Sequence, residues 1–580
     1  MLASMPSRPT IAILGGGISG LSAAWYFSRQ LPRLPGPLAG ARIVLIEREK
    51  RLGGWVQSDR ADLGGGAMAL LERGPRTLRV AKTQECQAVL EMVADLGLQD
   101  QVVAVDRAAP AAQNRFLFFD GRLRALPAKP VHLLTRFARP LWGAPYAVLH
   151  DLLAPRNAPP AGPAAGDDDE SVSSLVSRRL GSALDDNVVS AVINGIYAAD
   201  TRVLSSRAVA TPLWRSERST GSALLGLLLP LEGRPSGAEG GEAGPWQLQM
   251  SAGAQALWAR LEAASMYSFR GGMQTLTDQL AERLANSPNV TLIRGRACEV
   301  LRYERGLAAA EPSSDDNSGD RGGGFSIGLE GGAQIRADYL VSALPAAQLG
   351  SLLESWTTAS PLAPPLPRLV TCSGSNSNSS LPYTDIAVVN LVYKGANMAV
   401  AQLGFGFLVP RAASREVNAL GVVFDSCMLP EQDGGADISR FTVMLGGTHF
   451  RDILGDPATV SRADLHRHAM DTMRRALGVS REPVLAAAHV QRQCIPAYPV
   501  GYVGMLEEVD QWLTRSFGGR LSVVGAAYGG PSVPSCILHA RQLAEQWAAA
   551  AIGSSTGGDG LPWNATPVTG LRGVLRQYCC

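Results

Sequence analysis

Three glycines near the amino terminus have the spacing of a cradle for a diphosphate. Gly15, Gly17 and Gly20 form a Gly-x-Gly-x-x-Gly turn between an apolar run at residues 10–14 and an apolar-periodic run that follows. In such a turn the first glycine allows a tight bend, the second lets the backbone approach a pyrophosphate, and the third lets a helix pack closely on a strand. The spacing predicts a dinucleotide site, with an ordinary glycine turn of another α/β unit as the alternative.

The next acid and the next glycines favour a larger nucleotide. Glu47 ends a second apolar run at residues 42–46, where its carboxylate can accept hydrogen bonds from both ribose hydroxyls. Arg51, Gly53 and Gly54 follow, and they place a cation and a glycine pair where the diphosphate and rings of a larger cofactor could lie. This pattern favours FAD over NAD, unless the glycine pair only forms a connecting loop.

These residues require strands and helices from three separate parts of the chain. After the first βαβ unit, residues 270–276 open a helix, and residues 290–293 and 336–345 are predicted strands. A third part at residues 521–547 is predicted as a strand, a glycine turn and a helix whose amino terminus can point at the flavin end of FAD. A nucleotide lobe assembled from three segments again favours FAD.

Composition excludes several classes of protein. The 580 residues are too many for one core, and the net charge of +2 with no long basic run argues against nucleic-acid binding. The eight cysteines show no metal-ligand or disulfide spacing. No apolar run is long enough to span a bilayer, and from the nine residues before the first strand we expect no cleavable presequence.

The rest of the chain alternates between regular elements and biased stretches. A helix is predicted at residues 83–98, a β-hairpin turning at Asp120-Gly121 within residues 114–126, and a mixed or antiparallel sheet over residues 386–447. The stretches rich in small, acidic or glycine residues are expected to be flexible insertions without chemistry; they are residues 155–170, 233–244, 311–324 and 372–380.

Seven phrases together resemble one enzyme family. They lie at residues 52–55, 73–79, 114–117, 404–410, 424–426, 442–447 and 524–530. They resemble the mitochondrial eukaryotic protoporphyrinogen oxidases, within the flavin amine oxidase superfamily, from about residue 10 to residue 548. One departure is Gln57, at a position where many relatives carry arginine.

The resemblance implies an α/β fold with three lobes. It implies a Rossmann-like FAD-binding lobe built from residues 1–109, 262–345 and 508–580, and a mixed-sheet substrate lobe at residues 346–507. Residues 110–261 would form a mostly α-helical membrane-binding lobe with disordered insertions. The implied cofactor contacts are Gly15, Gly17, Ile18, Ser19, Gly20, Glu47, Arg48, Gly53, Gly54, Trp55, Val300, Gly525, Val533, Pro534 and Ser535.

The implied substrate is a flat, apolar tetrapyrrole with two propionates. Arg115 matches the family's propionate-binding arginine, and a guanidinium suits a bidentate carboxylate contact. The positions that match the walls of the slot are Gly195, Ile196, Phe405, Gly406, Leu408 and Met444. By spacing alone, Arg115 could be a solvated strand end and the apolar residues ordinary core.

The implied reaction is the six-electron oxidation of protoporphyrinogen IX to protoporphyrin IX in haem synthesis. Hydride would pass from a bridge carbon to the flavin in each of three cycles, with dioxygen reduced to hydrogen peroxide. No catalytic base is identified, because no histidine forms an evident pair with a carboxylate, and no metal is expected. The alternatives are an amine or polyamine oxidase and a flavoprotein that keeps FAD without catalysis.

Residues 126–153 are the candidate membrane segment. Their leucines and aromatic residues, with interspersed cations, have the composition of an amphipathic helix pair lying in one leaflet. The resemblance implies peripheral or monotopic contact with the mitochondrial inner membrane, and it favours a homodimer. The alternative is that these helices cover the core of the protein itself.

Overall fold

A computed structural model describes most of the chain. It describes residues 8–34, 37–64, 66–126, 144–153, 169–225, 250–304, 323–359, 364–371, 381–395, 404–554 and 568–578. The chain divides into two compact units. The first unit comprises Met1–Val56, Leu276–Leu381 and Val503–Cys579, and the second comprises Gln57–Thr275 and Pro382–Tyr502.

The first unit is built on a parallel sheet of five strands. Their order across the sheet is β10 (Val290–Arg294), β2 (Arg42–Glu47), β1 (Thr10–Leu14), β14 (Tyr339–Ser342) and β20 (Leu521–Val523). Neighbouring strands are all parallel, so their carboxyl ends lie on one edge. Such an edge is where open α/β sheets bind ligands.

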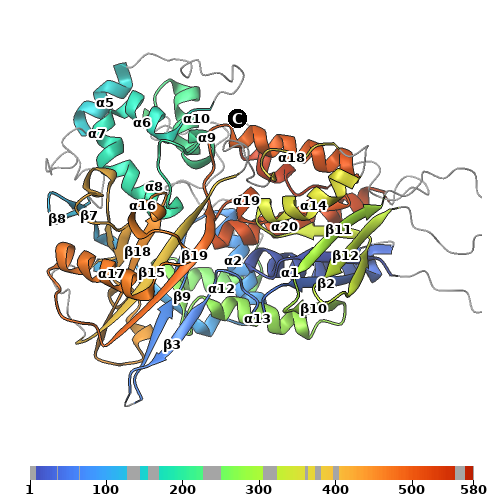
Figure 1. The fold of residues 1–580 in the computed structure, drawn as a ribbon, viewed down its shortest axis with the longest axis horizontal. Helices are drawn as coiled ribbons and strands as arrows, with labels where there is room; N and C mark the ends of the chain where they lie inside the picture. The colour runs from blue at the N-terminus through green and yellow to red at the C-terminus, as the bar shows by residue number, and fades with distance from the viewer. Residues whose placement is uncertain are drawn as a thin grey trace, which may run out of the picture. The chain divides into compact units, whose positions relative to one another are not determined.

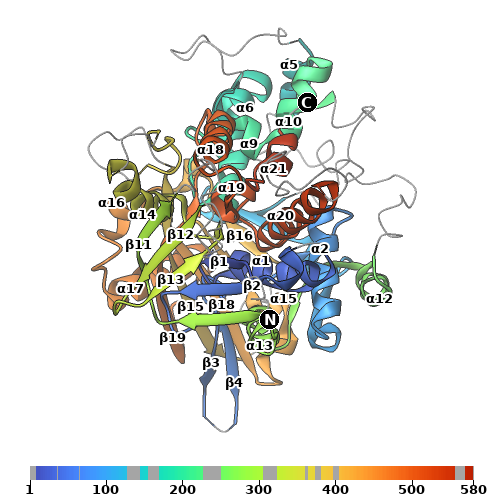
Figure 2. The ribbon, with the colours of Figure 1, turned by 90° about the vertical axis from the view of Figure 1, so that its right-hand side faces the viewer.

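Two helices from opposite ends of the chain pack together in this unit. α1 (Ile18–Gln30) lies beside α20 (Val533–Ser554), as Figures 1 and 2 show. The rings of Phe27 and Trp547 meet edge to face with centroids 5.0 Å apart. α13 (Gln274–Ala285), α14 (Ala346–Ala359), α18 (Tyr502–Phe517) and α21 (Arg572–Arg576) are further helices of this part of the chain.

A small antiparallel sheet also belongs to the first unit, and it corrects one prediction. It contains β11 (Cys298–Glu304), β12 (Gly324–Leu329) and β13 (Gln334–Ala337). Residues 336–345 were expected to form one strand, but the chain leaves β13 and starts β14 after Asp338. The carboxylate of Asp338 accepts a hydrogen bond from the Thr10 amide at 2.7 Å, which holds this break beside β1.

The second unit is built on a mixed sheet of seven strands. The order is β19 (Leu485–Pro496), β15 (Tyr383–Lys394), β18 (Ile438–Gly447), β17 (Gly421–Val423), β16 (Gly406–Leu408), β7 (Arg115–Phe119) and β8 (Arg122–Ala125). Only the β16–β7 pair is parallel. The mixed sheet and the β7–β8 hairpin are therefore confirmed; Asp120 and Gly121 both have positive φ, as a two-residue primed turn requires.

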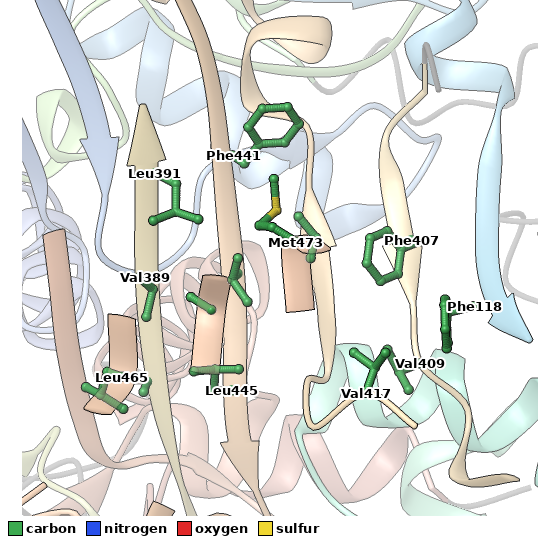
Figure 3. Packing of buried hydrophobic residues seen from close by; sticks show 14 of the residues in the cluster. Phe118, Val389, Leu391, Phe407, Val409, Val417, Phe441, Leu445, Leu465 and Met473 are labelled. Carbon is green, nitrogen blue, oxygen red and sulfur yellow. The ribbon is translucent and has the colours of Figure 1, made fainter. Parts of the chain in front are cut away.

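One face of this sheet carries an apolar core. Phe407, Leu445 and Phe118 point from the strands into the cluster, and Leu465 and Met473 come from α17 (Arg462–Leu477), as Figure 3 shows. α16 (Phe450–Leu454) contributes Phe450 and Leu454 to the same cluster. The opposite face of these strands is also largely buried, and there Ile386, Val388 and Leu420 form a second apolar cluster beside polar groups.

Smaller elements complete the second unit. Two antiparallel sheets contain β3 (Ser58–Asp62) with β4 (Met68–Glu72), and β5 (Leu78–Arg79), β9 (Ala264–Phe269) and β6 (Val102–Asp106). The longer helices are α2 (Gln84–Asp95), α5 (Ala144–Leu153), α6 (Val172–Leu180), α8 (Ser190–Tyr197), α10 (Thr211–Thr220) and α12 (Ala252–Leu261). Among the described residues, no helix combines the length and apolarity needed to cross a bilayer.

Most of the predicted flexible insertions lie outside the described residues, but Asp169, Glu170 and Gly324 are described and buried. Gly324 begins β12, so the prediction of an insertion up to residue 324 is wrong at its end. Asp169 accepts a hydrogen bond from Ser205 Oγ at 2.6 Å and from the Gly501 amide at 2.9 Å. Glu170 pairs with Arg178 at 2.5 Å. The prediction of a solvated loop up to residue 170 is therefore wrong at its end, because these acids anchor α6 and the residues around it.

Candidate functional site

The glycine turn after β1 is closely packed against its own helix. Gly15 has a φ of +97°, and its amide donates to the Ile46 carbonyl at 2.9 Å. A Cβ on Gly20 would stand 1.8 Å from the Gly15 carbonyl oxygen, so only glycine fits there. The turn and the first turn of α1 are thereby fixed at the carboxyl edge of the parallel sheet.

Gly17 leaves room that no described protein atom fills. A Cβ there would meet nothing nearer than 3.8 Å, and Gly17 gives the α1 amino terminus no side-chain cap. Unlike Gly20, this glycine is not demanded by the packing of the chain itself. Ser19, in the first turn of α1, lies beside Gly525 at the end of β20, where a Gly525 Cβ would be 3.2 Å from Ser19 Oγ. The helix start therefore fits a diphosphate.

Glu47 stands at the end of β2, as expected. Its Oε2 accepts a hydrogen bond from the Gly16 amide at 2.6 Å and its Oε1 accepts one from the Glu49 amide at 2.9 Å. A carboxylate has about four acceptor sites, so both oxygens can still accept ribose hydroxyls. The neighbouring Arg48 side chain is largely exposed and lies 3.4 Å from Glu49.

The second glycine pair lies against the first turn. The Gly53 amide donates to the Gly16 carbonyl at 2.8 Å, and a Cβ on Gly54 would be 3.1 Å from the Gly17 Cα. Arg51 helps to form this loop. Its guanidinium donates to the carbonyls of Leu52, Val56 and Gly54, so its hydrogen bonds close the loop around the glycine pair.

The remaining predicted cofactor residues also lie in the first unit. The Gly295 amide donates to the Glu49 carbonyl at 3.0 Å. This hydrogen bond holds the residues that lead into β11 next to the end of β2, and the half-exposed Val300 lies in β11. Val533, Pro534 and Ser535 form the first turn of α20, where the Ser535 amide donates to Ser532 Oγ at 3.1 Å. Trp55 is 44% exposed. All fifteen predicted cofactor contacts thus belong to one unit.

The predicted substrate residues gather in the second unit. Gly406 pairs with Arg115 across the parallel β16–β7 contact, and the Phe405 amide donates to the Asn114 carbonyl at 3.0 Å. Gly406 has a φ of +143°, and a Cβ there would stand 2.1 Å from the Val422 carbonyl oxygen, so glycine is required for this register.

An apolar row continues from Leu408 across the sheet. Leu408 pairs with Gly421, and Gly421 pairs with Met444, so the two apolar side chains share one face. A Cβ on Gly195 of α8 would be 2.7 Å from Leu408 Cδ2, which places α8 against the same row. Ile196, the next residue of α8, is 55% exposed. The structure therefore brings together Arg115, Phe405, Gly406, Leu408, Met444 and Gly195.

Arg115 carries a positive charge without a described partner. Within the described residues, its guanidinium makes no hydrogen bond or ion pair. Arg115 is exposed as a residue, but partial burial of its guanidinium, and after it the positive charge of Arg79, lowers its pKa. Arg79 is paired with Met266 in the β5–β9 contact, and Met266 packs in the same cluster as Phe405 and Met444. Two guanidiniums thus stand near one apolar row, an arrangement that suits an anion.

A buried polar network on this face was missed from the sequence. Glu72 at the end of β4 accepts hydrogen bonds from the Met273 amide at 2.8 Å and from Ser58 Oγ at 2.7 Å. Burial raises the pKa of Glu72 to about 7, against the effect of these hydrogen bonds and of the Arg76 charge. The sequence signal that could have found Glu72 is its position as an acidic residue directly after the apolar run at residues 68–71.

The network extends into the central strands. Asn390 Nδ2 donates to the Glu72 carbonyl at 3.1 Å, and Thr442 Oγ1 lies 2.7 Å from an Asp425 carboxylate oxygen. Asp425 also pairs with Arg76 at 2.9 Å. Three of the described histidines depart from the expectation of no carboxylate pair. His449 lies 3.4 Å from Asp452 and His466 lies 3.7 Å from Glu482, while His489 Nε2 lies 3.5 Å from Asp59. Burial lowers the pKa of His489, and we assign this residue no catalytic role.

Comparison with known proteins agrees with this geometry. The sequence model of the family described as "Flavin containing amine oxidoreductase" matches residues 18–546. The protoporphyrinogen oxidase of Bos taurus is 35% identical over 92% of this chain and 97% of that relative. The chain belongs to the protoporphyrinogen oxidase family. It is an FAD-dependent oxidoreductase, as the sequence analysis predicted.

More distant relatives support the same family and the same fold. The protoporphyrinogen oxidase of Schizosaccharomyces pombe is 30% identical over 93% of this chain and 98% of that protein. A crystal structure of a putative protoporphyrinogen oxidase from Exiguobacterium sp. 255-15 superposes with a TM-score of 0.67 at 18% identity, covering 94% of this chain and all of that one. This second likeness concerns the fold, and it confirms the mixed α/β architecture.

Proposed function

We propose that this protein oxidises protoporphyrinogen IX to protoporphyrin IX. The observation that supports this most directly is the apolar row of Leu408 and Met444, which lies on the face where Arg115 stands without a described carboxylate partner. A flat apolar ring would bury itself on the row, and a propionate would pair with the guanidinium. The family membership of the chain supports the same substrate.

The chain itself binds and orients the substrate. Arg115, with Arg79 nearby, fixes the carboxylate edge of the ring, and Leu408, Met444 and Phe405 exclude water from its flat face. FAD, when bound, supplies hydride acceptance and passes the electrons to dioxygen, so that three cycles remove six electrons and release hydrogen peroxide. We assign no residue as a catalytic base.

The same charges disfavour an amine substrate. A protonated amine near Arg115 would be repelled by that guanidinium and by Arg79, at a cost of about 1 kcal/mol or more for each charge at short range. An amine oxidase would need an acidic partner for its cationic substrate at this edge. The amine and polyamine oxidase alternative is therefore the weaker one.

Replacing Arg115 with alanine tests the proposal. We expect the KM for protoporphyrinogen IX to rise by about 10- to 100-fold, since a hydrogen-bonded contact between two charged groups contributes about 1.5–3 kcal/mol. The measurement is the aerobic growth of porphyrin fluorescence above the autoxidation blank. Arg122→Ala, at an exposed arginine on the other strand of the same hairpin, is the control and should keep the wild-type KM.

Two outcomes would contradict the proposal. A yellow, FAD-loaded wild-type protein that produces no porphyrin above the blank would exclude the substrate. A normal KM in Arg115→Ala would exclude Arg115 as a carboxylate-binding residue while leaving the reaction itself in place. Three molecules of hydrogen peroxide per porphyrin are expected if dioxygen is the acceptor, and sedimentation should show whether the protein is the homodimer that we propose.

We also propose that residues 126–153 contact a membrane from one side, at the mitochondrial inner membrane. Most of this segment lies outside the described residues, but the end of α5 is described. Leu149, Leu152 and Leu153 are 56%, 58% and 74% exposed. On the opposite side of the helix, Asp151 is buried and pairs with Arg179 at 2.8 Å. The three leucines therefore face away from the core at helical spacing, as an interfacial helix requires.

Replacing all three leucines with serine should weaken membrane binding. We expect the partition coefficient for vesicles of phosphatidylcholine with an anionic lipid to fall about tenfold or more, because each lost side chain removes apolar area that the bilayer would cover. Cosedimentation with the vesicles is the measurement. Val484→Ser removes an exposed apolar residue elsewhere and should change nothing. Unchanged binding of the triple variant would remove α5 from the contact.

A further inference from the structure

The last described segment of the chain folds back onto the edge of the parallel sheet. Residues 568–578 lie beyond residue 546, where the match to the family ends. The Val523 amide of β20 donates to the Thr569 carbonyl at 2.9 Å, and Ser522 Oγ donates to the Val568 carbonyl at 2.6 Å. Thr569 Oγ1 also donates to the carboxylate of Asp510. This segment is therefore bound to the strand that leads into the Gly525 turn.

The segment is buried as well as hydrogen-bonded. Leu571 and Thr569 are fully buried, and Val574 is 1% exposed. Gly570 has a φ of +90°, and a Cβ there would stand 2.3 Å from the Val523 carbonyl oxygen. Only glycine allows this close approach, which fixes where the Gly570 carbonyl points.

His539 of α20 joins this segment to the Gly525 turn. Its Nε2 lies 2.8 Å from the Gly570 carbonyl oxygen, and its Nδ1 lies 3.3 Å from the Gly525 amide. An amide can only donate and a carbonyl can only accept, so Nδ1 is the acceptor and Nε2 carries the proton. The ring is 2% exposed, and burial lowers the pKa of His539 to about 4, so that it stays neutral near pH 7.

The turn that His539 holds faces the start of α1. Gly525 has a φ of +114° and follows β20 at the carboxyl edge of the sheet, next to Ser19. The adjoining Val524 amide donates to the Ser342 carbonyl of β14 at 2.9 Å. The orientation of Gly525 is thus determined from one side by the sheet and from the other by the imidazole.

We propose that His539 is a positioning residue that links residues 568–578 to the Gly525 turn and thereby slows the release of FAD. The inference rests on FAD binding at this turn. It assigns a role to a segment outside the family match, and it requires both hydrogen bonds of the ring. Loss of the ring leaves the Gly525 amide and the Gly570 carbonyl buried without their partner, so the turn relaxes and its grip on the cofactor weakens.

Three substitutions separate the two hydrogen bonds from the space that the ring fills. His539→Ala removes both contacts. In His539→Asn the amide oxygen replaces Nδ1 toward Gly525, and in His539→Gln the amide nitrogen replaces Nε2 toward Gly570. Leu353→Ala in α14, at a fully buried site of the same unit, is the control for a loss of stability alone. FAD release is followed by free-flavin fluorescence after dilution of the loaded, full-length protein.

We expect His539→Ala to release FAD about tenfold faster than wild type, with His539→Asn and His539→Gln each about threefold faster. Leu353→Ala should release FAD at the wild-type rate even if its Tm falls by as much as that of His539→Ala. Equal release from wild type and His539→Ala would overturn the inference, and so would release that simply follows Tm in all four variants. Wild-type protein purified without FAD would instead count against cofactor binding at this turn.

Discussion

Replacing Gly20 with alanine is expected to prevent stable folding of the first unit. The added Cβ would stand 1.8 Å from the Gly15 carbonyl oxygen and 3.4 Å from the Ala343 Cβ. The contact at 1.8 Å is with backbone, which cannot rotate away as a side chain can. Overpacking at a backbone contact costs about 3 kcal/mol or more. The variant should be insoluble, or soluble with a lower Tm and no bound flavin.

Gly17→Ala is the matched control, because the same methyl group then enters space that the chain leaves open. Its nearest described neighbour would be the Gly54 Cα at 3.8 Å, and the backbone there is extended. We expect the apoprotein Tm to change little, while the Kd for FAD rises by about 10- to 100-fold as the methyl group blocks close approach of the diphosphate. Apoprotein Tm and FAD titration by flavin fluorescence measure the two effects separately.

The comparison of these two variants distinguishes a glycine kept for packing from one kept for a ligand. Equal loss of apoprotein stability in both would show that the whole turn is structural. Tight FAD binding by Gly17→Ala would place the diphosphate elsewhere and contradict the proposed cofactor site.

The parts of the site that could be predicted from the sequence are those made by neighbouring residues. The strand, glycine turn and α1 are contiguous, and Asp120-Gly121 lies between two short strands, so local rules were sufficient. Glu47 was found because it directly follows an apolar strand. In each case the chemistry is encoded within a short stretch of the chain.

The parts that could not be predicted depend on contacts between distant segments. The parallel pairing of Arg115 with Gly406 joins residues far apart in the sequence, and only the family resemblance pointed to both. The hydrogen bonds of Arg51 with the carbonyls of its own loop could not be predicted from its position in the sequence. Asp169 belongs to an acidic run typical of solvated loops. Its burial results from hydrogen bonds with the distant Ser205 and Gly501, which no local pattern predicts.

Glu72 is the second residue at which we expect a large effect, and here the effect depends on pH. Its ordinary pKa of 4.5 rises to about 7 in the folded protein, chiefly because the carboxyl is buried. Below about pH 4.5 both the folded and the unfolded chain hold the proton, so the stability contribution is fully present. As the pH rises to 7 the unfolded chain loses the proton first, and folding stability falls. Above pH 7 the loss is complete, at about 3 kcal/mol.

Glu72→Gln should remove this loss. The oxygen of the substituted amide can accept the hydrogen bond from the Met273 amide, and its nitrogen can meet Ser58 Oγ, so the network keeps its contacts without a charge to desolvate. We expect the variant to be more stable than wild type by about 2–3 kcal/mol at about pH 8, and no more stable than wild type at about pH 4.5. The measurement is Tm as a function of pH across this range.

The direction of the pH dependence decides what Glu72 does. Glu49→Gln, at an exposed acid, is the control and should leave the pH profile of Tm unchanged. If Glu72→Gln were instead destabilised at high pH, the carboxylate would be ionised in the fold, held by the Met273 amide, Ser58 and the charge of Arg76. The buried network would then carry a negative charge on the side of the sheet opposite the apolar cluster, and the protonated carboxyl inferred here would be wrong.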